Sequence, residues 1–166
     1  GKSFEKNFSS YTNSKYSLAV ANGTLALDLC LRSIGITKGD EVIVTARTFI
    51  ASASCISILG GIPVFVDVDM NTQNISVDSI MKGISKKTKA IICVHFAGYP
   101  CDMPKIMKFA KAKKLLVIED CAQAHGAMIN AKSVGSFGDI NAWSFCNDKI
   151  LTTGGEGGMV TSNRKN

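Results

Sequence analysis

Lys149 is the candidate reactive group of this sequence. It lies in the stretch DINAWSFCNDKILTTGGEGG, residues 139–158, between an alternating segment and a glycine-rich one. The alternation at 141–145, which includes Trp143 and Phe145, predicts a half-buried strand. A lysine that loses solvent at the end of such a strand can act as an amine nucleophile and form a Schiff base. Because most lysines are solvated, this residue alone also fits a surface position beside a flexible loop.

A glycine-rich segment follows Lys149 and leaves space close to the backbone. Residues 154–158 read GGEGG, and glycine adopts backbone conformations that are closed to other residues. A ligand can therefore approach the main chain there. The segment lies late and leads into a predicted strand, and NGTLAL at 22–27 does not fit G-x-G-x-x-G. Both observations disfavour a dinucleotide-binding domain, which carries that pattern between its first strand and helix.

A second candidate site lies where Asn22, Gly23 and Thr24 precede the apolar run 25–34. Asn22 or Thr24 can cap a helix over this run. A glycine at a helix start lets a ligand approach the free N–H groups, and the helix dipole favours an anion there. Gly23, Thr24 and Leu25 are therefore a candidate phosphate cradle, although they also fit an ordinary helix cap.

Three further candidate residues lie near the ends of predicted strands. Asp120 follows the strand expected at 115–118, Ser144 lies at the end of the strand before Lys149, and Phe49 opens a predicted helix. In α/β sheets, ligands bind beyond the carboxyl ends of the strands. Taken singly, Asp120 fits a helix cap or a surface carboxylate. Ser144 equally fits a strand hydroxyl bonded to backbone, and Phe49 fits a core residue.

Together these groups suit one cofactor, pyridoxal phosphate. Its aldehyde needs a lysine, and its pyridine nitrogen needs a carboxylate to stay protonated. Its phosphate needs a helix start and hydroxyls, and its ring needs an aromatic or apolar face. The joint arrangement, more than any single residue, supports this hypothesis.

The positions of these residues depend on an alternation of predicted strands and helices. Helical spacing of Phe4, Phe8 and Tyr11 predicts a helix over 4–12. The nearly continuous apolar run 88–95 predicts a strand in a sheet covered on both faces. This alternation indicates an α/β fold with a mostly parallel sheet. Further strands are expected at 15–20, 41–45, 63–68, 115–118 and 141–145, and helices at 25–34, 49–59, 77–84 and 104–114.

The composition indicates one globular domain. The chain has 166 residues, of which 46% are hydrophobic and 19% are charged, so it can bury a real core and is not of the disordered class. No apolar run approaches the length of a membrane span, and residues 1–5 lack the apolar segment of a secretory leader. We therefore expect no membrane association.

The cysteines and the charge exclude two further classes of site. The six cysteines show no C-x-x-C spacing, so neither zinc ligation nor a disulfide framework is expected. Buried free thiols in a reducing cytosol are the simple interpretation, which predicts a cytoplasmic location. The net charge is +6, but the chain has only three arginines and its lysine runs fit solvated helix faces. Nucleic-acid binding is therefore not expected.

The sequence resembles the DegT/DnrJ/EryC1/StrS family of pyridoxal-phosphate sugar aminotransferases. The matching stretches occur in order and cover nearly the whole chain. They are NGTLALDLCLRSIGITKGDEVIVTARTFIASA (22–53), GGIPVFVDVDMNTQNI (60–75), TKAIICVHFAGYPCDMPKI (88–106), VIEDCAQAHGA (117–127) and WSFCNDKILTTGGEGGMV (143–160). The resemblance implies the large domain of a fold-type I aminotransferase, a three-layer sandwich around a mostly parallel sheet.

The resemblance also implies a role for each residue around the cofactor ring. Lys149 would form the Schiff base with pyridoxal phosphate and then carry protons during the reaction. Asp120 would pair with the pyridinium nitrogen, and Gln123 would contact the hydroxyl side of the ring. Phe49 would stack on the ring.

The same resemblance implies which residues bind the cofactor phosphate. Ser144 and the turn of Gly23, Thr24 and Leu25 would hold it. The reaction of the family moves an amino group from glutamate to a keto sugar carried on a nucleotide diphosphate, which serves surface polysaccharide and related pathways. A dehydratase subgroup has histidine in place of the lysine, so Lys149 implies the transaminase branch. Family members are homodimers.

Family members are also considerably longer than this chain. We therefore interpret residues 1–166 as an incomplete cofactor-binding large domain without the small C-terminal domain, and we do not expect 161–166 to pack back on the sheet. The leading hypothesis is the sugar aminotransferase, with impaired cofactor binding and turnover in the isolated fragment. The alternative is a non-catalytic cofactor-binding or dimerisation module left by truncation. Either interpretation predicts exposed apolar surface where the remainder would pack.

Overall fold

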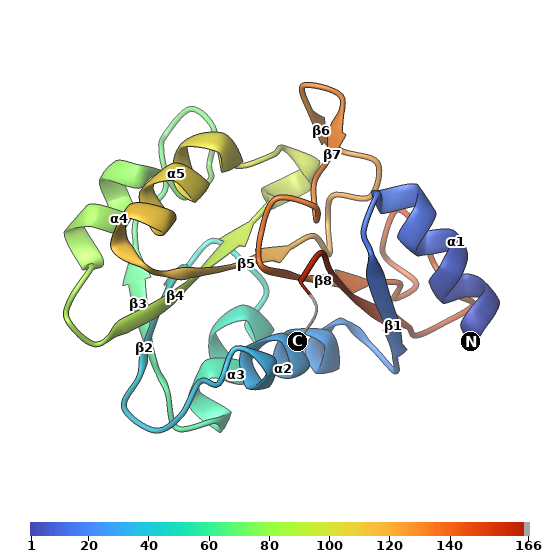
Figure 1. The fold of residues 1–166 in the computed structure, drawn as a ribbon, viewed down its shortest axis with the longest axis horizontal. Coiled ribbons are helices and arrows are strands. Elements are labelled where there is room, and N and C mark those ends of the chain that lie inside the picture. The colour runs from blue at the N-terminus through green and yellow to red at the C-terminus, as the bar shows by residue number, and fades with distance from the viewer. Residues whose placement is uncertain (165–166) are drawn as a thin grey trace.

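Short apolar runs of β-branched residues form a seven-stranded sheet in the computed structural model, which describes residues 1–164 (Figure 1). The order across the sheet is β1-β9-β8-β5-β4-β2-β3. The five strands from β8 to β3 are parallel, whereas β9 runs antiparallel to both of its neighbours. The strands are β1 (Tyr16–Val20), β2 (Glu41–Thr45), β3 (Ile62–Val66), β4 (Thr88–Val94), β5 (Leu116–Asp120), β8 (Ile140–Ser144) and β9 (Gly158–Ser162).

Helices cover both faces of this sheet, which confirms the predicted three-layer α/β architecture (Figure 1). One apolar cluster joins the sheet to α2 (Gly23–Ser33) and α3 (Ala51–Ile58). A second cluster, on the opposite face, joins it to α4 (Val77–Gly83) and α5 (Met103–Lys113). The central strands β2, β4 and β5 are therefore buried from two sides, as their continuous apolar sequences require.

A third, aromatic cluster attaches α1 (Lys2–Thr12) to the other end of the sheet. The ring of Phe8 lies edge-on to Trp143 and to Phe145, with centroid distances of 5.1 and 5.2 Å. Phe4 meets Phe145 in the same way at 5.1 Å. Because edge-to-face contacts suit the quadrupoles of aromatic rings, this packing fixes α1 against the strand that leads to the loop carrying Lys149.

The strand register brings the ends of β5 and β8 together. Asp120 pairs with Ala142 on one side and with Val94 on the other. Asp120 is therefore the last residue of β5, not a residue after the strand as predicted, and Ser144 ends β8 close by.

Two further predictions about elements are wrong. The helix expected from residue 49 begins at Ala51, so Phe49 lies in the turn before α3. Thr161 and Ser162 belong to β9, which packs between β8 and β1, although we expected the last residues not to pack on the sheet. Residues 165–166 of that prediction lie outside the described residues.

Three short elements were not predicted. They are the 3-10 helix η1 (Phe96–Gly98) and the hairpin of β6 (Met128–Ile129) and β7 (Lys132–Ser133). Within residues 1–164, the helices are too short or too polar to cross a bilayer.

Candidate active site

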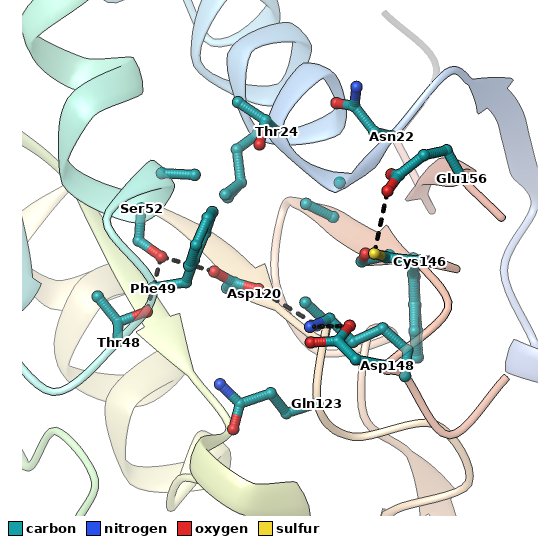
Figure 2. Close-up of a pocket in the computed structure, with 18 residues that line it drawn as sticks. Asn22, Thr24, Thr48, Phe49, Ser52, Asp120, Gln123, Cys146, Asp148 and Glu156 are labelled. Atoms are coloured by element: carbon teal, nitrogen blue, oxygen red, sulfur yellow. Dashed lines mark hydrogen bonds and ion pairs between the residues drawn. The ribbon is translucent and has the colours of Figure 1, made fainter. Parts of the chain in front are cut away.

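A cavity of about 410 Å³ opens at the carboxyl ends of β5 and β8, beside the starts of α2 and α3 (Figure 2). This volume falls in the range of small-molecule sites, about 300–1,000 Å³. Seven of the eight predicted site residues line it: Gly23, Thr24, Phe49, Asp120, Gln123, Ser144 and Lys149. The eighth, Leu25, has an exposed side chain and is not among the lining residues.

Asp120 provides a buried carboxylate at the floor of the cavity. Its side chain accepts hydrogen bonds from the Ser52 hydroxyl (2.8 Å) and from the Ala122 N–H (3.2 Å). Only 4% of the residue is exposed, and burial raises the pKa of the carboxyl above its usual range, although both hydrogen bonds oppose this shift. The two donors thus favour the charged form at a position where burial disfavours it.

Lys149 lies in the loop between β8 and β9 and is held by a neighbouring carboxylate. Its Nζ is 2.8 Å from Oδ1 of Asp148, and 23% of its side chain is exposed. The hydrogen bond from Lys149 and its charge lower the pKa of Asp148. The ammonium group therefore has a partner and still reaches the cavity wall.

The start of α2 approaches the sheet closely enough to require glycine. The Asn22 side chain caps the helix by accepting from the Leu25 N–H at 2.9 Å. That leaves the N–H groups of Gly23 and Thr24 without intrahelical acceptors. A Cβ on Gly23 would lie 2.7 Å from the Cβ of Ser144, so this turn rests directly against the end of β8. The two halves of the predicted phosphate cradle are thus adjacent.

Phe49 and Gln123 also line the cavity (Figure 2). Phe49 is 67% exposed, which contradicts a core role. The side-chain oxygen of Gln123 accepts from the N–H of Ala97 at 2.8 Å, which leaves its amide NH₂ available to a ligand.

The lining residues that the sequence reasoning missed include five with polar side chains: Thr48, Ser52, Cys146, Asp148 and Glu156. Thr48 and Ser52 are four residues apart, but Thr48 precedes both the predicted helix and α3, so helical spacing does not point to the pair. Cys146 and Glu156 come from the two ends of the loop, and the thiol donates to the Glu156 carboxylate at 3.1 Å. No local sequence pattern predicts this hydrogen bond, because it depends on how the glycine-rich loop turns back.

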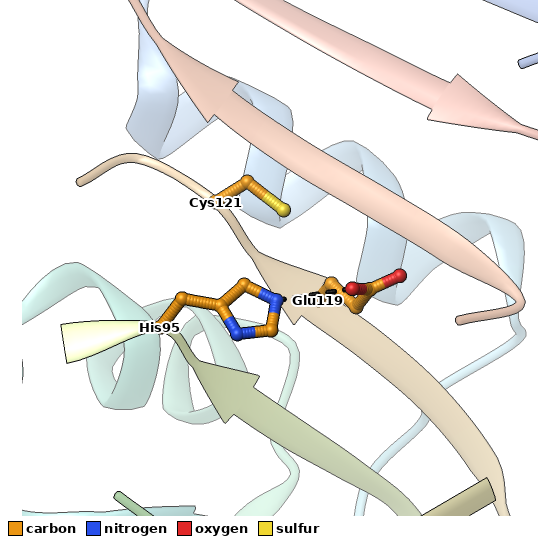
Figure 3. A group of neighbouring side chains, drawn as sticks. All are labelled: His95, Glu119 and Cys121. Atoms are coloured by element: carbon orange, nitrogen blue, oxygen red, sulfur yellow. Dashed lines mark hydrogen bonds and ion pairs between the residues drawn. The ribbon is translucent and has the colours of Figure 1, made fainter. Parts of the chain in front are cut away.

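A second group of polar residues lies at the carboxyl ends of the central strands β4 and β5, where His95, Glu119 and Cys121 offer ligand atoms within 4.8 Å of one another (Figure 3). His95 Nδ1 accepts from the Cys101 N–H, and Nε2 lies 3.0 Å from Glu119. The two oxygens of Glu119 also accept three backbone N–H bonds from the loop 135–138.

These bonds occupy the ring nitrogens of His95 and both carboxylate oxygens of Glu119, which a metal would need. Burial opposes ionisation of Glu119, but the bonds from His95 and from the backbone outweigh it and lower the pKa of this carboxyl. The group therefore acts as a structural network that ties the end of β5 to the segment before β8.

The sequence matches the profile of the DegT/DnrJ/EryC1/StrS aminotransferase family over residues 1–166. The chain belongs to this family. It is 50% identical over 162 residues to a GDP-perosamine synthase from Escherichia coli O157:H7, covering 98% of this chain and 44% of that protein. It is also 50% identical over 160 residues to a dTDP-3-amino-3,6-dideoxy-alpha-D-galactopyranose transaminase from Aneurinibacillus thermoaerophilus, covering 96% of this chain and 44% of that protein.

Solved structures of family members share the fold of this chain. An aminotransferase from Psychrobacter cryohalolentis has a TM-score of 0.97 and 58% identity, over 98% of this chain and 41% of that one. NtdA from Bacillus subtilis with bound cofactor PMP has a TM-score of 0.93 and 34% identity, over 99% of this chain and 37% of that one. The chain thus spans less than half the length of these relatives.

Proposed function

We propose that residues 1–166 form the cofactor-binding large-domain part of a pyridoxal-phosphate-dependent sugar aminotransferase. The observation that carries this proposal is the convergence of Lys149, Asp120 and the start of α2 on one cavity. Membership of the aminotransferase family supports it, as does the bound PMP in the similar structure of NtdA.

The donors and acceptors around the cavity fit the chemistry of this cofactor. When bound, pyridoxal phosphate supplies an aldehyde that bonds to amines and a protonated ring that withdraws electrons. The free N–H groups of Gly23 and Thr24 and the hydroxyl of Ser144 would hold the phosphate. The N–H of Leu25 already donates to Asn22, so its predicted phosphate contact would require that cap to open.

Other lining residues would bind the ring and the aldehyde of the cofactor. Asp120 would hold the proton on the ring nitrogen, because a buried carboxylate attracts a cation strongly. Phe49 would cover one ring face, and the amide of Gln123 would bond to the ring hydroxyl. Lys149 would hold the cofactor covalently until a substrate amine displaces it, and the released Nζ would then accept and return the proton at the carbon that exchanges nitrogen.

The proposed substrates are glutamate and a keto sugar on a nucleotide diphosphate. The names of the two relatives support the sugar, since both specify a nucleotide-linked amino sugar. Biosynthesis of surface polysaccharide is the proposed setting, as the name of the spore coat polysaccharide relative SpsC of Bacillus subtilis suggests. Free cysteines, typical of a reducing compartment, support a cytoplasmic location.

A homodimer is part of the same proposal. Large apolar side chains are exposed close to the cavity, including Phe49 (67%), Ile50 (68%) and Ile150 (68%). Apolar groups gathered at one place favour coverage by another protein surface. Sedimentation analysis with and without cofactor would measure the mass, and a strict monomer in both conditions would contradict a homodimer.

Covalent labelling tests the central assignment. The purified protein is mixed with pyridoxal phosphate, reduced with borohydride and digested, and the modified peptide is identified by mass spectrometry. We expect one stoichiometric label on Lys149, and we expect Lys149→Ala to lose it while keeping its circular dichroism spectrum.

Lys105 provides a matched control. It also lies 2.8 Å from an aspartate, Asp102, but outside the cavity. Lys105→Ala should therefore label like the wild type. Labels scattered over surface lysines, or a full label in Lys149→Ala, would refute the assignment of Lys149.

A further inference from the structure

We propose that Thr48 and Ser52 form a relay of two hydroxyl groups that positions Asp120 and keeps its carboxylate charged. Both would be positioning residues, because they act on the cofactor site through Asp120. The effect on Asp120 itself needs no cofactor, whereas its consequence for binding rests on the proposed function.

The hydrogen bonds run in one direction. The Ser52 hydroxyl donates to Oδ2 of Asp120 at 2.8 Å, and the hydroxyls of Thr48 and Ser52 are 2.8 Å apart. A serine hydroxyl has a single proton. Because Ser52 gives that proton to Asp120, Thr48 must donate to Ser52. Figure 2 shows the two contacts, one joining Thr48 to Ser52 and the other joining Ser52 to Asp120.

The fold places this relay where it can act on the cavity. Ser52 is fully buried in the first turn of α3, and Thr48 lies one turn earlier, after the carboxyl end of β2. Asp120 comes from the end of β5, on the far side of β4 in the sheet order. The relay therefore links α3 to a strand that is not adjacent to β2, and it fixes the carboxylate from one side.

The relay opposes the effect of burial on the charge of Asp120. Desolvation raises the pKa of Asp120, and the Ser52 hydroxyl is the largest of the contributions that lower it, followed by the Ala122 N–H. The other titratable groups around Asp120 are His95 after β4, Lys149 in the loop after β8, and the thiols of Cys30, Cys55 and Cys121. A charge-assisted hydrogen bond in such a site contributes more than a neutral one.

The relay can be tested directly on the cofactor-free protein. The carboxyl groups of aspartate are labelled with ¹³C, their chemical shifts are followed against pH, and Asp120→Asn assigns the signal of Asp120. Ser52→Ala removes the donor, and Thr48→Val removes only the outer hydroxyl with almost no change of shape. Ser57→Ala, an exposed serine on the same helix, is the control.

We expect a graded result. In Ser52→Ala the titration of Asp120 should move to higher pH, because the neutral carboxyl is favoured when a donor to its charged form is lost. Thr48→Val should move it in the same direction by less, and Ser57→Ala should leave it unchanged. At neutral pH, the affinity of Ser52→Ala for pyridoxal phosphate should fall about tenfold.

Two outcomes would overturn the relay. One is a wild-type titration of Asp120 in Ser52→Ala, and the other is an equal shift in the Ser57→Ala control. If Ser52→Ala does not fold, the titration of Thr48→Val decides alone, since that site is only partly buried. Failure of the Lys149 label with a normal graded titration would refute the proposed function and leave the relay standing.

Discussion

Asp120 and Asp148 are carboxylates beside the same cavity, but they differ in their contact with solvent. Asp120 is buried and its pKa is raised, whereas Asp148 is exposed and paired with Lys149, which lowers its pKa. Two carboxylates that line the same cavity can therefore serve different purposes. The exposed one balances the ammonium charge, and the buried one presents a concentrated negative charge to a ligand.

The burial of Asp120 predicts that replacing its carboxylate will stabilise the protein and weaken cofactor binding. A carboxyl whose pKa is higher in the folded state binds more protons there than in the unfolded state, so its contribution to stability decreases as the pH rises through that window. Asp120→Asn should therefore increase the free energy of unfolding near pH 7 by on the order of 1 kcal/mol. The amide can still bond to Ser52, and the gain should fade as the pH falls.

Denaturant unfolding at pH 7.5 and pH 5 measures this effect, with exposed Asp67→Asn as the control. The same Asp120→Asn protein should bind pyridoxal phosphate more weakly than the wild type. A loss of stability at pH 7.5 would mean that the carboxylate is well solvated by its partners, contrary to the burial seen here.

At the scale of elements, the contact of α2 with the sheet depends on two glycines. A Cβ on Gly158, the first residue of β9, would overlap the carbonyl of Asn22 and lie 3.0 Å from the nitrogen of Gly23. Backbone atoms cannot move aside as a flexible side chain can. The helix start and the strand start therefore determine each other's position.

Gly158→Ala should destabilise the protein by about 2–3 kcal/mol and displace the start of α2. Gly154→Ala, in the loop that precedes β9, is the matched control. Its added methyl group meets no atom within 4 Å, so only its positive φ costs energy, about 1 kcal/mol. Thermal unfolding of both variants measures the difference. Equal melting temperatures would show that β9 and α2 can separate at little cost.

Much of this arrangement could be predicted from the sequence, and the exceptions share a cause. An apolar run predicted the strand that ends at Asp120, and alternation predicted the strand that ends at Ser144. Asp120 was nevertheless expected just after its strand, and β8 is buried throughout where a half-buried strand was expected. The start of α3 and the contacts of Ser52 were missed, because both depend on residues distant in sequence. The place of β9 was missed for the same reason, since its partners β1 and β8 are chosen by the whole sheet.

For the whole molecule, the outermost strands of the sheet determine how it meets other proteins. Strand β3 is one edge, and it exposes Phe65 (56%) and Ile62 (44%). An edge with unpaired backbone groups and apolar side chains can pair with another chain. We therefore expect the isolated protein to associate as its concentration rises.

Phe65→Lys should reduce this association several-fold, because charge on an edge strand opposes pairing. Met81→Lys is the control, since Met81 is comparably exposed (51%) but lies on α4. Light scattering over a concentration series would measure both. An equal reduction in the two variants would mean that net charge, not the edge of β3, controls association.

The position of β9 between β1 and β8 also determines the order in which the chain can fold during synthesis. Tyr16 pairs with Ser162, so β1 has no strand partner until nearly the whole described chain has left the ribosome. Helix α1 cannot pack on the sheet early either, because Phe4 and Phe8 pack on Trp143 and Phe145. Of the residues described here, those at the N-terminal end are thus the last to pack on the sheet, and until then the aromatic face of α1 is open to chaperones.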